Sequence, residues 1–86
     1  MKSFVTDRFW KAFAELPDHI QKAARKQYLL WQGNPQHPSL QFKPIGQLWS
    51  VRVTQDYRAL AIIENGSYHW IWIGTHAEYD QILRGR

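Results

Sequence analysis

Apolar side chains at helical spacing mark the first part of the chain. A helix is expected to begin at a cap, Thr6 or Asp7, because either side chain can accept a hydrogen bond from the first turn. Pro17 should end it, since proline lacks the backbone N–H that a helix interior uses. The apolar positions recur at i, i+4 and i+7: Phe9, Phe13 and Leu16. This spacing predicts an amphipathic helix that ends before Pro17.

A second helix is predicted from Asp18, a favourable cap, to the stop signal Gly33-Asn34-Pro35. One side of this helix is mainly apolar and another side is basic. The apolar side contains Ile20, Ala24, Gln27, Tyr28 and Trp31, and the basic side contains Lys22, Arg25 and Lys26. Two helices joined by a proline turn should form an antiparallel hairpin whose apolar stripe must be covered by other elements.

The second half of the chain has the alternation of a small sheet. Strands are expected at residues 41–43, 48–53, 57–63 and 68–73, followed by a short helix at residues 77–83. Asn65-Gly66 is a strong hairpin signal, so the last two strands should pair antiparallel. Strict alternation would place Tyr68, Trp70 and Trp72 on one face. The expected fold is α+β, with an N-terminal two-helix hairpin packed on a small, mainly antiparallel β-sheet and a short C-terminal helix.

Composition indicates one domain, residues 1–86, with a small aromatic core. A chain of 86 residues buries a limited share of its surface, and its five Trp, four Tyr and four Phe compensate for this. Each aromatic side chain buries about 150–250 Å². Trp10, Phe13 and Trp31 are therefore expected to pack the helices against the sheet.

Charge and residue usage narrow the class of protein. The formal charge of +4 favours an anionic partner, either nucleic acid or an acidic protein segment. The lack of cysteine, of a leader and of a long apolar run predicts a cytoplasmic protein with no membrane segment. His19, His37 and His69 lack the spacing of a metal site and there is no glycine-rich phosphate loop, so neither a metal nor a nucleotide cofactor is expected.

Two arginines stand in otherwise apolar strands. Arg52 follows Trp49-Ser50-Val51, and Arg58 precedes Ala59-Leu60-Ala61. A charged side chain in such a strand needs an anion, a carboxylate or water as its partner. A polynucleotide backbone would supply the anion.

Several short motifs follow one another along the chain: Leu16-Pro17, Asn34-Pro35, residues 48–53, Asp56-Tyr57-Arg58, and Ile73-Gly74-Thr75-His76 leading to Tyr79. Together they resemble the RelE/ParE superfamily of toxins from type II toxin–antitoxin operons. The Tyr-Arg pair after the strand and turn is the most specific of them. The resemblance implies a cognate antitoxin as partner. It implies either ribosome-dependent cleavage of mRNA, as in the RelE branch, or inhibition of DNA gyrase, as in the ParE branch.

Site residues follow from this resemblance. Arg58 resembles the arginine that RelE-type nucleases direct at the scissile phosphate, and its guanidinium can bind two phosphate oxygens. His76 is expected to move a proton, and Tyr79 to stack on a base or donate a proton. Lys43 and Arg52 are the expected phosphate-binding residues.

Each of these residues also has a structural interpretation. Arg58 could pair with Asp56, Glu64 or Glu78. His76 could cap the last helix, and Lys43 could be a charge that protects an edge strand.

The sequence also departs from the family. No lysine occupies the strand Trp49-Ser50-Val51, where RelE carries two, and His76 replaces an expected arginine.

The sequence therefore predicts a ribosome-dependent endoribonuclease that cleaves mRNA by metal-free acid–base transesterification. A gyrase inhibitor without chemistry of its own is the first alternative, and the missing lysines favour it. A non-toxic member that only binds an antitoxin is the second.

Overall fold

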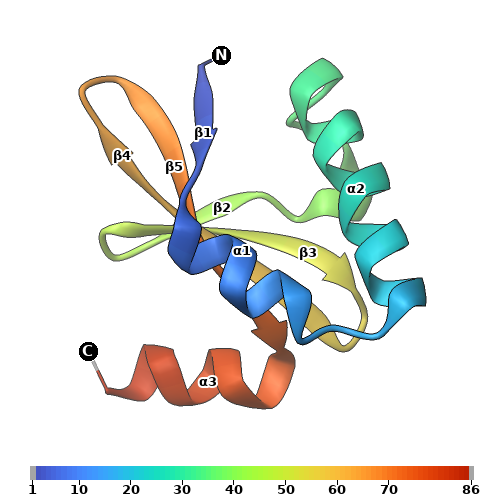
Figure 1. Cartoon of the computed structure of the whole chain (residues 1–86). Helices are drawn as coiled ribbons and strands as arrows, with labels where there is room; N and C mark the ends of the chain where they lie inside the picture. The colour runs from blue at the N-terminus through green and yellow to red at the C-terminus, as the bar shows by residue number, and fades with distance from the viewer. Residues whose placement is uncertain (1, 86) are drawn as a thin grey trace.

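A five-stranded sheet with three helices forms the part of the chain that the computed structural model describes, residues 2–85 (Figure 1). The elements are β1 (Ser3–Val5), α1 (Asp7–Ala14), α2 (Asp18–Gly33), the 3-10 turn η1 (Pro38–Leu40), β2 (Lys43–Ile45), β3 (Leu48–Thr54), β4 (Tyr57–Glu64), β5 (Ser67–Thr75) and α3 (His76–Arg84). The strand order is β1-β5-β4-β3-β2; β1 and β5 pair parallel, and the other neighbouring strands pair antiparallel. The predicted α+β class is confirmed.

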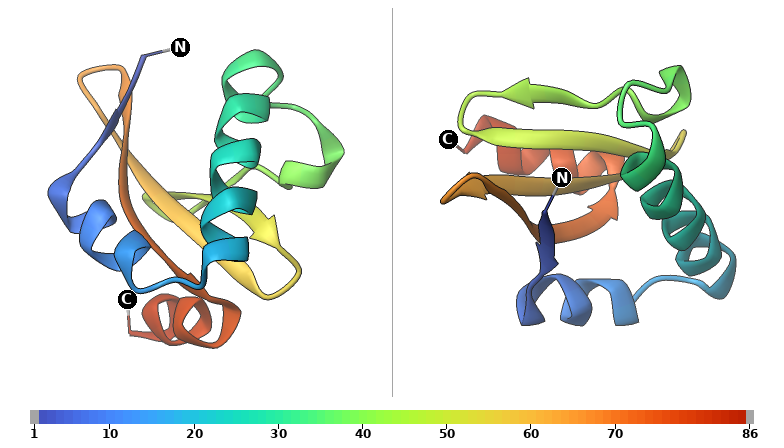
Figure 2. Two further views of the ribbon diagram at one scale, coloured as in Figure 1. Left: turned by 45° about the vertical axis from the view of Figure 1, so that its right-hand side comes forward. Right: turned by 90° about the horizontal axis from the view of Figure 1, so that it is seen from above.

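The helices take up different positions around the sheet. α1 packs on β5 and α2 packs on β3, and the two helices diverge instead of lying side by side (Figures 1 and 2). α3 contacts β4 and β5 and lies apart from the other two helices. The predicted hairpin is therefore present, but its two arms are splayed.

The main core lies between α1, α2 and one face of the sheet. Trp31 is at its centre, with its ring edge-on to the rings of Tyr68 and Trp70 at centroid distances of 5.3 and 5.2 Å. Phe13 is also buried there, as predicted. Trp10 is not, because 44% of it is exposed.

Local signals explain most element boundaries. The Thr6 hydroxyl accepts a hydrogen bond from the Phe9 N–H, so Thr6 is the predicted cap of α1. For α2 the cap position is Pro17, and Asp18 is instead the first helical residue. An acidic side chain is favourable there because it faces the positive end of the helix dipole.

Two short strands differ from the prediction. β1 was not predicted, because three residues are too few to show an alternation. Two hydrogen bonds extend its pairing with β5: the Thr6 N–H donates to the Trp70 carbonyl, and the Tyr68 N–H donates to the Lys2 carbonyl. The strand predicted at residues 41–43 is β2, Lys43–Ile45, and includes Pro44. An edge strand tolerates proline because one side of it needs no hydrogen-bond donor.

A bulge in β5 overturns the prediction that Trp72 shares a face with Tyr68 and Trp70. Leu60 pairs with Trp72 while Ala61 pairs with Trp70, so Ile71 has no partner on β4. One extra residue reverses the alternation beyond it. Trp70 and Ile73 therefore both join the main core, and Trp72 lies on the opposite face.

Beyond the bulge, Gly74 lies closely against the Trp72 side chain. A Cβ at Gly74 would overlap the Trp72 ring and would stand 2.9 Å from Glu78 Oε1. Only glycine allows this approach between β5 and the first turn of α3.

Gly74→Ala is expected to lower the free energy of unfolding by about 1–3 kcal/mol, because the rigid Trp72 ring must move. Gly33→Ala is the control: its Cβ would meet nothing within 4 Å, and alanine in a helix is favoured over glycine by up to about 1 kcal/mol. Urea denaturation of both variants measures the difference. Equal stability of Gly74→Ala and the parent protein would contradict the close approach.

Candidate functional site

Three basic residues share the face of the sheet opposite α1 and α2. Lys43 pairs with Ser50, and Arg52 pairs with Arg58, which in turn pairs with Gly74. Paired residues point to the same side, and so do residues two positions apart on one strand. Because Val51, Val53 and Ala59 alternate with these positions and lie in the main core, the basic residues face away from it. We call this surface the basic face.

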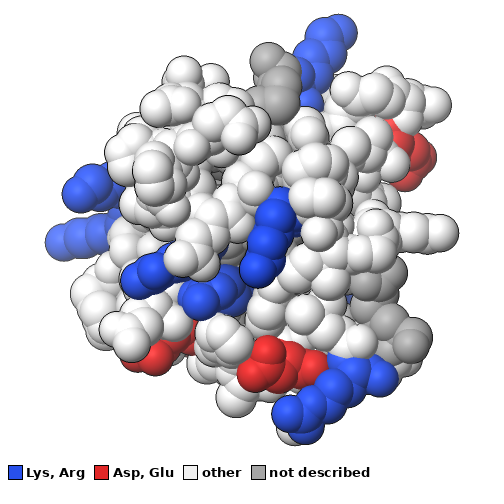
Figure 3. Space-filling model, turned by 180° about the vertical axis from the view of Figure 1, so that it is seen from behind, with Lys and Arg blue, Asp and Glu red and all other residues white. Residues whose placement is uncertain are grey.

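Basic side chains are also seen to gather in this region. In the view from behind Figure 1, Lys and Arg atoms lie near the middle of the surface, with carboxylates below them (Figure 3). Such a distribution can hold a negatively charged chain.

Arg52 and Arg58 stand directly opposite each other on neighbouring strands. Like charges in this arrangement are unfavourable unless an anion lies between or beside them. Burial lowers the pKa of Arg58, and the charge of Arg52 lowers it further; Tyr79, Asp80 and Asp56 act in the opposite direction. The pair is therefore a candidate anion site, and the register of the sheet keeps its two residues together.

The Arg58 guanidinium is fixed by neutral groups. Its Nη1 donates to the carbonyl oxygens of Thr54, Gln55 and Tyr57 at 2.6, 3.1 and 3.0 Å. These carbonyls hold the side chain without cancelling its charge. The β3–β4 turn thus positions Arg58, and the guanidinium keeps its full positive charge.

Within residues 2–85, the structure excludes a salt bridge for Arg58. The ion pair found there joins His76 to Asp80, and no carboxylate of the described chain pairs with Arg58. The structural alternative for Arg58, a partner among Asp56, Glu64 and Glu78, is therefore wrong.

Helix α3 starts at the end of β5 with a capping box. The Thr75 hydroxyl accepts from the Glu78 N–H at 3.1 Å, and Glu78 Oε1 accepts from the Thr75 N–H at 2.9 Å. Hydrogen bonds from the Thr75 backbone and hydroxyl lower the pKa of Glu78. Because Thr75 is the cap, the alternative that His76 caps this helix is wrong.

His76 is tied to the turn that holds Arg58. Its N–H donates to the Asp56 carbonyl at 2.7 Å. Its Nδ1 lies 3.2 Å from Asp80 Oδ2, and its ring is edge-on to Tyr79 with 5.5 Å between centroids. The His76 and Asp80 side chains are 43% and 46% exposed, whereas Tyr79 is only 6% exposed.

This arrangement can support proton transfer. If Nδ1–H of His76 donates to Asp80, Nε2 carries the lone pair that can accept a proton. Asp80 was not predicted as a site residue. The available signal was its spacing, four residues after His76 on a helix.

Arg52, Arg58, His76 and Tyr79 thus lie in one neighbourhood, linked by register, ring contact and electrostatics. Lys43 is exposed on the edge strand β2, and its cross-strand partner Ser50 is two residues from Arg52. Lys43 is thus placed for a flanking phosphate and equally for protecting the edge.

Other ionisable groups have local roles. His37 accepts a hydrogen bond from the Ser39 N–H at 3.1 Å, and His69 stacks on Phe4. Among residues 2–85, no three His, Asp or Glu side chains are placed to hold a metal ion. Nor does this part of the chain include a helix with the length and apolarity to cross a bilayer.

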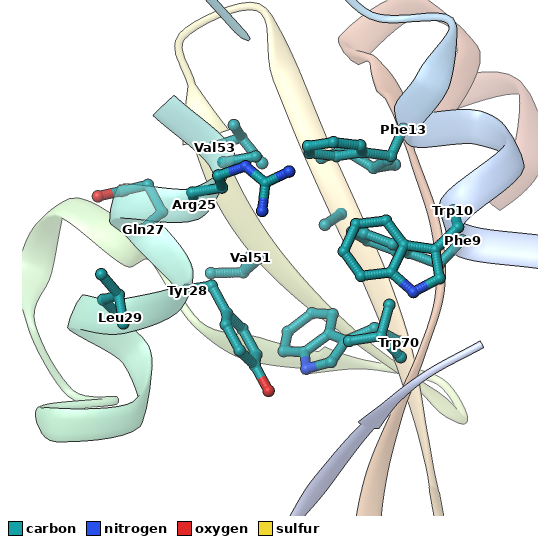
Figure 4. A pocket seen from close by; sticks show the side chains of 14 residues that line it. Phe9, Trp10, Phe13, Arg25, Gln27, Tyr28, Leu29, Val51, Val53 and Trp70 are labelled. Carbon is teal, nitrogen blue, oxygen red and sulfur yellow. The ribbon is translucent and has the colours of Figure 1, made fainter. Parts of the chain in front are cut away.

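An apolar groove of about 350 Å³ lies on the other face of the sheet, between α1 and α2 (Figure 4). Phe9, Trp10 and Phe13 form one wall, Tyr28 lies on the other, and Trp70 is part of the floor. The Arg25 guanidinium reaches across to the Phe13 ring, 5.1 Å from its centre. The splayed helices create this groove, which was not predicted.

The chain matches a known family and several known folds. The family of ParE-like toxin domains matches residues 18–81. The RelB–RelE antitoxin–toxin complex from Methanococcus jannaschii contains a similar chain, with 14% identity, a TM-score of 0.71, and 92% of this chain and 96% of that chain covered.

Two further structures are similar. YafQ from E. coli strain BL21(DE3) is 13% identical, with a TM-score of 0.72 over 91% of this chain and 96% of that chain. The YoeB/ParE toxin from Agrobacterium tumefaciens is 15% identical, with a TM-score of 0.67 over 88% of this chain and 99% of that chain. No curated protein sequence matches significantly. At these identities the likeness is one of fold.

Inorganic phosphate is expected to raise the melting temperature of the protein at constant ionic strength. A ligand that binds only the folded state stabilises it by about 2.7 kcal/mol at one hundred times its Kd. Arg52→Gln should remove most of this stabilisation and should not destabilise the phosphate-free protein, because the repulsion with Arg58 disappears. Arg8→Gln, an exposed change on α1, is the charge-matched control. Equal phosphate effects in all three proteins would rule out the anion site.

Proposed function

The chain belongs to the family of ParE-like toxin domains, and on this premise we propose that it is the toxin of a type II toxin–antitoxin system that cleaves mRNA on the ribosome, in the cytoplasm. One observation carries the proposal. Arg58 is held by three backbone carbonyls, has no carboxylate of the described chain within salt-bridge distance, and faces Arg52 beside the His76–Asp80 pair.

The proposed reaction is transesterification at a phosphodiester. The 2′-oxygen forms a bond to phosphorus as its proton passes to a base, and the bond to the 5′-oxygen breaks as that oxygen receives a proton. The products are a 2′,3′-cyclic phosphate and a free 5′-hydroxyl. Arg58 and Arg52 would stabilise the additional negative charge on the phosphorane.

Proton transfer is assigned to His76, with Asp80 as the residue that orients its ring. Tyr79 would hold the imidazole through the edge-on ring contact, and its burial favours this positioning role over stacking on a base. Lys43 would bind a phosphate next to the scissile one.

The ribosome would complete this small site. Positioning of the reacting groups can supply about 7–11 kcal/mol of a reaction barrier. Ribosomal RNA that holds the message for in-line attack would therefore explain how so few catalytic groups suffice.

Inhibition of DNA gyrase is the second candidate. It is favoured by Ser50, a neutral and buried residue in the part of β3 where RelE carries lysines. A gyrase inhibitor would use the same face for binding alone. A member that only binds an antitoxin would neither cleave RNA nor bind gyrase.

A cognate antitoxin is the proposed protein partner, and the groove is its proposed site. The groove is apolar, and Arg25 at its mouth together with the basic side of α2 favours an acidic amphipathic segment. The groove and the basic face lie on opposite faces of the sheet.

Arg58→Ala is expected to lower the rate of mRNA cleavage by about 10²–10³-fold, because it removes a charge placed for the transition state. Mapping of mRNA 5′ ends after brief induction measures this, with Arg8→Ala as the control for loss of an arginine. Both variants must be shown to be folded, since Arg58 also binds the β3–β4 turn. Frame-dependent breaks that persist in folded Arg58→Ala would refute the assignment. Growth arrest without breaks would point to gyrase.

Trp10→Glu is expected to weaken the complex with the cognate antitoxin by about 2 kcal/mol or more, as for other tryptophans at the centre of an interface. The reason is that it places a negative charge at the wall of the groove. Ile63→Glu is the matched control, since Ile63 is 48% exposed and does not line the groove. Titration calorimetry of the two variants compares them. The same affinity for both would place the antitoxin elsewhere.

A further inference from the structure

A stacked aromatic pair stands on the basic face, away from the arginines. Phe4 on β1 pairs with His69 on β5, which pairs with Ile62 on β4. Ile62 and Arg58 are an even number of residues apart on β4, so all these side chains point to the same side. The neighbouring residue Val5 packs against the main core instead.

The two rings are in contact, and Phe4 is accessible. The rings of Phe4 and His69 are stacked, with 5.1 Å between centroids and 23° between planes. Phe4 is nevertheless 51% exposed, so half of a large apolar side chain meets solvent. It does not line the groove between α1 and α2. An exposed aromatic ring held rigid by a second ring is a platform on which a planar group can stack.

The distance to the anion site suits a nucleic acid strand. On β5, His69 and Gly74, the partner of Arg58, are five residues apart with one bulged residue between them, or about 13–17 Å. A stacked single strand rises by about 3.4 Å per nucleotide, so it would span this distance in about four or five nucleotides. An extended strand would need fewer.

Two further side chains of the same face lie between and beyond the two sites. Trp72 lies on β5 between the two sites and is partly exposed on the same face. Lys43 continues the line beyond Arg52 on β2. Cations together with aromatic rings along one path are the usual means of binding single strands, because every base can stack and every nucleotide carries a phosphate.

We propose that Phe4 and His69 form a base-stacking subsite for a nucleotide that flanks the scissile phosphate in the RNA strand. This proposal rests on the proposed function, because the strand is the one whose phosphate lies at Arg52 and Arg58. The occupant is RNA rather than a protein segment because the platform shares its face with three cations and lies apart from the apolar groove. The subsite adds affinity without reading a particular base.

The test is binding of labelled 2′-O-methyl oligouridylates, which lack the attacking hydroxyl and so remain intact. Fluorescence anisotropy compares a ten-nucleotide with a two-nucleotide strand. Phe4→Ala is expected to weaken binding of the ten-nucleotide strand by about 5- to 150-fold, the effect of losing one stacked base. Binding of the two-nucleotide strand should not change, because a strand with one internucleotide phosphate is too short to reach from the arginines to Phe4. Phe4→Trp should restore or increase the affinity.

Ile63→Ala is the matched control, since Ile63 is 48% exposed and its removal should leave both strands unaffected. Melting temperatures exclude misfolding, and His69→Ala provides a second variant if Phe4→Ala unfolds. Equal affinity of Phe4→Ala and the parent protein for the ten-nucleotide strand, or equal weakening at both lengths, would overturn the subsite. Loss of antitoxin binding without loss of RNA binding would identify it as a protein contact and overturn it too.

Arg52→Gln distinguishes failure of this proposal from failure of the proposed function. If Arg52→Gln weakens binding of both strands and Phe4→Ala weakens binding of neither, the phosphate site stands and the stacking subsite is wrong. If neither variant changes binding, the basic face does not bind RNA and both proposals fail.

Discussion

Two positive charges placed directly opposite each other on β3 and β4 are the constraint around which the rest of the site is arranged. A sheet could avoid this repulsion by a single substitution, yet Arg52 and Arg58 remain without a carboxylate between them in the described chain. The structure keeps Arg58 in place through the carbonyl oxygens of the β3–β4 turn. Anchoring by dipoles fixes geometry and preserves charge, which a salt bridge would not do.

The bulge at Ile71 links this pair to the second half of the site. By reversing the alternation of β5, it sends Ile73 into the main core and brings Trp72 and Gly74 to the face that carries the arginines. Gly74 then lets the first turn of α3 lie close to the sheet, and the capping box of Thr75 starts the helix there. His76 and Tyr79 owe their positions to this sequence of local features.

Sequence reasoning succeeded where local signals were strong. Thr6, Pro17 and Asn65-Gly66 mark a cap, a helix end and a hairpin, and all three elements are found. It failed for β1, which is too short to show a period, and for Trp72, because a bulge is a tertiary effect that strict alternation cannot include. Arg52 and Arg58 stood out as charges in apolar strands, whereas the pairing of Asp80 with His76 depends on side-chain geometry. The groove depends on the angle between α1 and α2, which no periodicity encodes.

The parallel pairing of β1 with β5 has a consequence for how the chain folds. The Thr6 side chain bonds to the Trp70 carbonyl, 64 residues further along the chain. Such contacts can form only after a large loop has closed, and proteins rich in them fold slowly for their size. During synthesis the first strand must wait for β5, and β5 is followed at once by the helix that carries His76. The sheet and the candidate site are thus completed together, so an unfinished chain has neither a stable core nor an assembled site.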